Sequence, residues 1–177
     1  MTIKTAPKGS ISQLGHSLGR IIHAFATAPE DSKIFMAKWD IKDGFWRLDC
    51  KSSEEWNFAY ILPSTVGTDD VTLVVPTSLQ MGWIESPRYF CTASETARDM
   101  ASQYVELPLA HLPDHPLLSH TNADVTDLPT TSPGPRCYLI EVYVDDFIGL
   151  AIPVSLEQLN HVASSVMYGI HNVSPPR

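Results

Sequence analysis

Three stretches of the chain place apolar residues at the spacing of a helix. In residues 10–28 apolar side chains recur every three or four positions, which predicts one amphipathic helix. Its single apolar face consists of Ile11, Leu14, Leu18, Ile21, Ile22 and Phe25. Residues 87–105 and 155–169 predict two further helices. Ser10 with Gln13 and Ser155 with Gln158 match capping boxes, and Ser86 before Pro87 predicts a cap.

Short apolar and β-branched runs between these helices predict strands. Residues 34–39 form one run that ends at Asp40, and residues 56–62 and 71–75 lie on either side of a turn. Residues 137–143 and 147–152 flank Val144-Asp145-Asp146, the pattern of a β-hairpin with two adjacent acids at its tip.

Residues 107–136 lie between the second helix and this hairpin. They hold six prolines and three histidines without periodicity, which predicts an insertion or a mobile loop. No cysteine lies near these histidines, so we expect surface residues rather than a zinc site.

Composition limits the class of protein. The chain has 177 residues, 44% of them apolar, which suits one domain. It lacks the roughly 20-residue apolar run of a membrane span and the apolar core of a signal peptide. Three cysteines far apart, without C-x-x-C, argue against a disulfide framework. We therefore expect a soluble intracellular domain, with its compartment left open.

Charge is unevenly distributed along the chain. The net charge is −8, but residues 1–51 hold 8 of the 12 Lys and Arg and only 5 of the 20 Asp and Glu. A polyanion would therefore be attracted to the first third and repelled by the rest, unless metal ions intervene.

Three carboxylates are the main candidates for chemistry. Asp145 and Asp146 would repel each other at an apolar hairpin tip unless a cation compensates them, although acids in an exposed turn are also common. Asp40 closes a predicted strand, where a turn or helix-capping acid is the ordinary alternative. Together the three side chains could hold two divalent ions ~3.5–4 Å apart, as in-line nucleotidyl transfer requires. In a third segment, residues 79–87, Gly82 lies just before the N-terminus of a predicted helix. A glycine there lets the backbone approach a ligand closely, and a helix N-terminus favours anions such as phosphate. The ordinary alternative is a junction between a loop and a helix.

These segments, in this order, resemble the palm of reverse transcriptases from retrotransposons and retroviruses. Residues 40–45 resemble the first catalytic motif, an Asp followed by a small residue and an aromatic residue. Gln80-Met81-Gly82-Trp83 with Ser86-Pro87 resembles the middle motif, although Gln80 stands where proline is usual. Tyr143-Val144-Asp145-Asp146 is similar to the signature tetrapeptide.

The resemblance implies a role for each matching residue. Asp40, Asp145 and Asp146 would be catalytic and would hold two Mg²⁺ ions, for which Mn²⁺ can substitute, with the Ile41 carbonyl as a further ligand. The incoming deoxynucleotide would be bound by the segments around both motifs, namely Ile41, Lys42, Asp43, Gly44, Phe45, Met81 and Gly82. Phe45 would exclude a ribose 2′-hydroxyl, and Tyr143 and Arg88 would contact the primer or template.

The implied fold is α+β, a polymerase palm with an antiparallel sheet, helices on one face and a partial fingers segment. We expect one incomplete domain with fingers residues at 1–33, palm at 34–106 and 137–177, and the proline-rich insertion at 107–136. No thumb, ribonuclease H or membrane segment is expected in it. The expected activity is RNA-directed DNA polymerase on an RNA or DNA template. Alternatives are a truncated, inactive retroelement remnant and a palm polymerase that copies RNA into RNA.

Overall fold

The computed structural model describes residues 7–63, 70–107, 137–152 and 155–174. These residues contain both helices and strands, and the strands form two small antiparallel sheets, an α+β arrangement. The helices are α1 (Gly9–Ser12), α2 (Leu14–Ala26), α3 (Ser86–Glu106) and α4 (Leu156–Val173), with short 3₁₀ turns η1 (Gly44–Arg47) and η2 (Glu55–Phe58). The strands are β1 (Phe35–Asp40), β2 (Tyr60–Leu62), β3 (Thr72–Val74), β4 (Cys137–Tyr143) and β5 (Asp146–Ile152).

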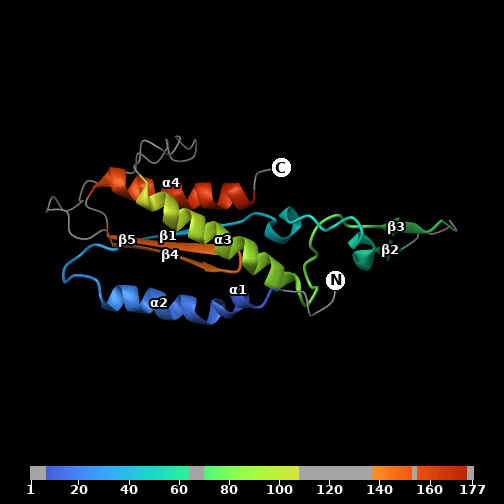
Figure 1. The fold of residues 1–177 in the computed structure, drawn as a ribbon, viewed down its shortest axis with the longest axis horizontal. Coiled ribbons are helices and arrows are strands. Elements are labelled where there is room, and N and C mark those ends of the chain that lie inside the picture. The colour runs from blue at the N-terminus through green and yellow to red at the C-terminus, as the bar shows by residue number, and fades with distance from the viewer. Residues whose placement is uncertain (1–6, 64–69, 108–136, 153–154, 175–177) are drawn as a thin grey trace.

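The larger sheet has the order β1-β5-β4, with all neighbours antiparallel. Helices α3 and α4 cover one of its faces and α2 lies on the other (Figure 1). Helices α3 and α4 therefore share one face, as expected, whereas α2, which lies in the predicted fingers segment, packs on the other face. The reason is visible in β4, where Ile140 and Val142 enter the core below α3 and α4 while Glu141 reaches α2.

The core lies between the sheet and the pair α3 and α4. Gly169 of α4 allows their close approach, because a Cβ there would lie 2.4 Å from the Ala97 carbonyl oxygen of α3. Phe90, Val142, Phe147 and Val166 are among the most buried side chains. Helix α4 begins as predicted, since the Ser155 hydroxyl accepts a hydrogen bond from the Gln158 N–H at 3.1 Å, and it continues past Gly169 to Val173.

The predicted helix over residues 10–28 is two helices, α1 and α2, separated at Gln13. Ser10 lies inside α1 and makes no capping bond. Half of the predicted apolar face is turned outward, because Leu18, Ile22 and Phe25 are exposed. The other three residues of that face are partly buried, and Ser17 is the one fully buried residue of α2. A cavity of about 720 Å³, bordered by Gly15 and Gly19, lies between α2 and the sheet.

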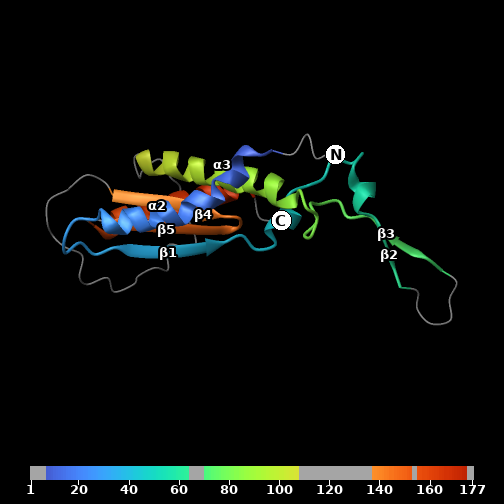
Figure 2. The ribbon, with the colours of Figure 1, turned by 90° about the horizontal axis from the view of Figure 1, so that it is seen from below.

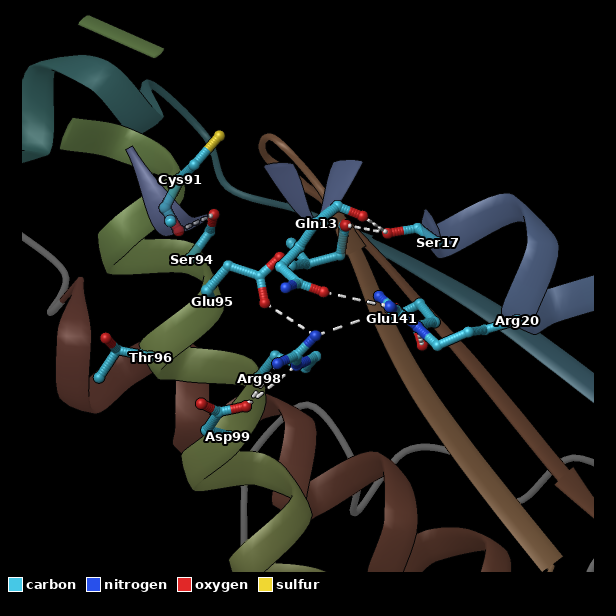
Figure 3. A network of polar contacts seen from close by, with 12 residues as sticks. Gln13, Ser17, Arg20, Cys91, Ser94, Glu95, Thr96, Arg98, Asp99 and Glu141 are labelled. Carbon is cyan, nitrogen blue, oxygen red and sulfur yellow. Dashed lines mark hydrogen bonds and ion pairs between the residues drawn. The ribbon is translucent and has the colours of Figure 1, made fainter. Parts of the chain in front are cut away.

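Polar contacts hold α2 on the sheet. The Ser17 hydroxyl donates to the Val142 carbonyl at 3.0 Å, and the Arg20 guanidinium donates twice to the buried Glu141 carboxylate. Arg98 of α3 lies 3.9 Å from the same carboxylate and pairs with Glu95 at 2.7 Å. Figure 3 shows these side chains converging from α2, α3 and β4. Charge and hydrogen bonds thus contribute to holding α2 on the sheet.

Two other local predictions need correction. Ser86 does not cap α3: it is the first residue of that helix, and its hydroxyl donates to the Gln80 carbonyl at 2.5 Å. The run at 56–62 is a strand only from Tyr60 onward, because η2 takes up its first part. The predicted loop at 107–136 lies almost wholly outside the described residues, which end at Leu107 and resume at Cys137.

Strands β2 and β3 form a separate two-stranded sheet that projects away from the helices and the larger sheet (Figures 1 and 2). Tyr60 pairs with Val74, Ile61 with Leu73 and Leu62 with Thr72. We call these two strands the β2–β3 arm.

Candidate metal centre

Strand register brings the first and last sequence motifs together. Asp40, the last residue of β1, pairs with Asp146, the first residue of β5. The Ile41 N–H donates to the Asp145 carbonyl at 3.3 Å, which joins the end of β1 to the tip of the β4–β5 hairpin. Two segments that are far apart in the sequence therefore meet at one end of the sheet.

The hairpin tip contains a residue in the left-handed region. Val144 has φ 60°, which L-residues with a branched Cβ rarely adopt. Its side chain packs against the hydrophobic core. Because the packing of Val144 fixes the backbone of the turn, it also fixes the position of the next two residues, Asp145 and Asp146.

The structure brings Asp40, Asp145 and Asp146 together as an acidic triad. One carboxylate oxygen from each lies within 4.8 Å of the other two. Asp40 is exposed and the other two are partly buried. Oxygens on opposite sides of a Mg²⁺ ion are ~4.2 Å apart, twice the metal–oxygen distance, so small side-chain rotations would suffice for shared coordination. The triad could hold a metal ion, and its donors are the hard oxygens that Mg²⁺, Mn²⁺ and Ca²⁺ prefer.

A lysine that the sequence reasoning missed compensates part of this charge. The Lys38 ammonium lies 2.9 Å from the Asp146 carboxylate. The hydrogen bond to Asp146, with smaller contributions from the charges of Asp40 and Asp145, raises the pKa of Lys38. Lys38 and Asp40 are two residues apart on one strand and so point to the same face, a signal that was present in the sequence.

The residues after Asp40 turn away from the sheet toward α3. Ile41 is buried, and its carbonyl, the predicted metal ligand, accepts the Gly44 N–H at 3.1 Å. Lys42 and Asp43 are exposed, and Asp43 has φ 58°. Phe45, the predicted steric gate, is half-buried and stacks on Phe90 with ring centroids 4.6 Å apart. The phenyl ring therefore has a packing role whatever else it contacts.

The middle segment is attached to the residues that follow η1, where Asp49 and Ser78 form an isolated β-bridge. The Leu79 N–H donates to the Leu48 carbonyl at 2.8 Å, and the Cys50 N–H donates to the Thr77 carbonyl at 2.8 Å. Met81 is exposed, and Gly82 has φ 92°, a conformation that favours glycine. The N-terminal end of α3, η1 and the hairpin tip lie near the same end of the larger sheet (Figures 1 and 2).

The two predicted primer or template contacts differ in their surroundings. Tyr143 is 55% exposed and pairs with Asp146 in the hairpin register, so it borders the triad. The Arg88 guanidinium pairs with the buried Glu85 carboxylate at 2.7 Å. Arg88 would have to share or exchange this partner to bind a phosphate.

No protein-family model and no curated protein matches the chain. The family therefore stays a prediction from the three motifs. None of the helices in the described residues is both long and apolar enough to cross a membrane.

Proposed function

We propose that the chain is the palm portion of an RNA-directed DNA polymerase, a reverse transcriptase. The observation that supports this most is the acidic triad, in which Asp40 from β1 meets Asp145 and Asp146 at the hairpin tip. Three carboxylates at a strand end and a hairpin tip suit a site that binds two divalent ions, which in turn bind the negatively charged phosphates of a substrate.

In this proposal the reaction joins a primer to a deoxynucleotide. The primer 3′-oxygen bonds to the α-phosphorus, the bond from that phosphorus to the pyrophosphate oxygen breaks, and the 3′-hydroxyl proton passes to water. Bound Mg²⁺ would supply charge neutralisation and a lower pKa for the attacking hydroxyl. Asp40 and Asp145 would hold both ions and Asp146 would support them, while Phe45 would pack beneath the sugar.

The metal site is tested first, by Mn²⁺ binding followed through the EPR signal of the free ion. We expect the D145N/D146N double variant to weaken binding at least about tenfold, since each lost carboxylate removes a charged ligand. The matched control is D31N, because Asp31 is exposed and its φ of 62° suits asparagine equally well. Equal binding by the double variant and wild type would contradict the metal site.

Primer extension on an RNA template, with Mg²⁺ and then Mn²⁺, tests the activity. Extension by the wild type that disappears in D145N/D146N would support the polymerase. A folded chain that binds Mn²⁺ at the triad but extends no primer would favour the alternative, an inactive retroelement remnant that keeps the palm fold. The charge distribution favours this alternative. Residues 52–177 hold only 4 of the 12 basic residues but 15 of the 20 acidic ones, and binding of nucleic acid depends on contacts between basic side chains and phosphates.

If extension is observed, Phe45→Ala separates the two polymerase branches. We expect the variant to accept ribonucleotides that the wild type rejects, since the ring would no longer exclude the 2′-hydroxyl. Loss of the ring also removes its stacking on Phe90, so the comparison uses the ratio of deoxynucleotide to ribonucleotide incorporation rather than the absolute rate. An unchanged ratio would contradict the steric-gate role and favour an RNA-copying polymerase or another gate.

A further inference from the structure

The β2–β3 arm leaves its apolar side chains in solvent. Ile61 is 65% exposed, and Tyr60, Leu62 and Leu73 are each more than 40% exposed. Trp56, in η2 before the arm, and Val71, next to Thr72 at the turn end of the arm, are exposed as well. An isolated two-stranded hairpin is marginally stable in water, so this arm gains most from a partner that covers it.

The backbone of the arm is also incompletely paired. Among the described residues no third strand joins β2 and β3. The outer edge of β2 therefore presents N–H and C=O groups that can pair with another strand. Pro63 ends β2 without blocking that edge, because it lies after the last paired residue.

Charge distinguishes the edge of β2 from the rest of the molecule. The chain carries −8, so two copies repel each other over most of their surfaces. Residues 56–68 contain no charged side chain, whereas β3 follows Asp69 and Asp70. The edge of β2 is thus a place where a second copy can approach without like charges meeting.

We propose that the chain self-associates through β2, edge to edge about a twofold axis, giving a sheet of order β3-β2-β2-β3. A strand edge is self-complementary in an antiparallel pair, as an isologous contact requires. With the axis at Ile61, this side chain faces its own copy and Tyr60 faces Leu62 of the other copy. Aliphatic and aromatic–aliphatic cross-strand pairs of this kind are stabilising. The contact is small, below the ~1,200 Å² of stable complexes, so the dimer is weak.

Sedimentation velocity over about 1–200 µM protein tests this, a range suited to micromolar dissociation constants. We expect the mass to rise with concentration from the 19.6 kDa monomer toward twice that value. I61K and I61E should each stay monomeric, because they place like charges opposite each other. An equal mixture of the two should recover the dimer, because the charges are then opposite.

The matched control is I84K. Ile84 is 78% exposed, against 65% for Ile61, and lies outside the arm, so its replacement removes at least as much exposed apolar surface without touching β2. Far-UV circular dichroism checks that each variant is folded. A wild type that stays monomeric at all concentrations would overturn the proposal, as would dimerisation of I61K alone. If I84K abolished the dimer as fully as I61K does, that would also overturn the proposal, since the association would then be non-specific. All outcomes are independent of metal binding and of primer extension.

Discussion

Lys38 places its ammonium group on Asp146, the same carboxylate that a divalent ion at the acidic triad would need. The two cations therefore compete, and we expect Lys38→Gln to tighten Mn²⁺ binding. Lys38 is well exposed, so solvent screens its charge, and we expect the gain in affinity to be modest, on the order of a few-fold. EPR titration at pH 7.5 measures it, with the exposed Lys51→Gln as control. Unchanged binding would contradict competition between the two cations, and weaker binding would mean that Lys38 assists the site.

Gly44 is constrained by packing. A Cβ at this position would lie 2.7 Å from a ring carbon of Phe90, which is buried and stacks on Phe45. We expect Gly44→Ala to lower the free energy of unfolding by about 1–3 kcal/mol, the usual cost of overpacking. Urea unfolding provides the measurement. Gly15→Ala is the control, since nothing lies within 4 Å of its Cβ and alanine favours a helix. Equal stability of Gly44→Ala and wild type would contradict the close contact.

At the scale of elements, α2 depends on the charge cluster between the helices and β4. Glu95 is buried in this cluster, and burial raises its pKa above the ordinary 4.5, with Asp99 and Glu141 adding to the effect and Arg98 and Arg20 opposing it. The folded state therefore holds the Glu95 proton more tightly than the unfolded state does. Stability from this group is full below the unfolded pKa and is lost as pH rises through the higher folded pKa.

Glu95→Gln removes this titration. We expect the variant to be more stable than wild type above the folded pKa of Glu95, and to lose the fall in stability that begins above about pH 4.5, the ordinary pKa. Urea unfolding from pH 4 to 8 tests it, with the exposed Glu157→Gln on α4 as control. Parallel pH profiles for wild type and Glu95→Gln would show that Glu95 is paired well enough by Arg98 to offset its burial.

At the scale of the whole molecule, the acidic triad and the core are separate. The buried apolar side chains lie between the sheet, α3 and α4, whereas the triad lies at one end of the sheet and contains an exposed carboxylate. We therefore expect EDTA to leave the far-UV circular dichroism unchanged and to shift Tm by no more than a few degrees, a stability change of less than ~1 kcal/mol. Unfolding on chelation would show instead that a metal ion holds the strands together.

Most elements could be predicted from the sequence because their patterns are local. The β4–β5 hairpin, the end of β1 at Asp40 and the Ser155 cap follow from short runs and turn residues, and the structure has them within a residue or so. The orientation of α2 could not be predicted in this way. An amphipathic pattern identifies an apolar stripe, but Ser17 and Arg20 find the Val142 carbonyl and Glu141 only when β4 is folded beside them.

The sequence by itself determined where the three candidate metal ligands lie: two adjacent acids at a hairpin tip and a third at the end of a strand. Only the tertiary structure decided that the third acid meets the other two, because the pairing of β1 with β5 sets that register. It also decided that Lys38 lies against Asp146 and that the β2–β3 arm stands apart from the core. Spacing along the chain specifies which way neighbouring side chains point. Contacts between segments that are distant in the sequence depend on strand register and on which faces are buried, and these are properties of the whole fold.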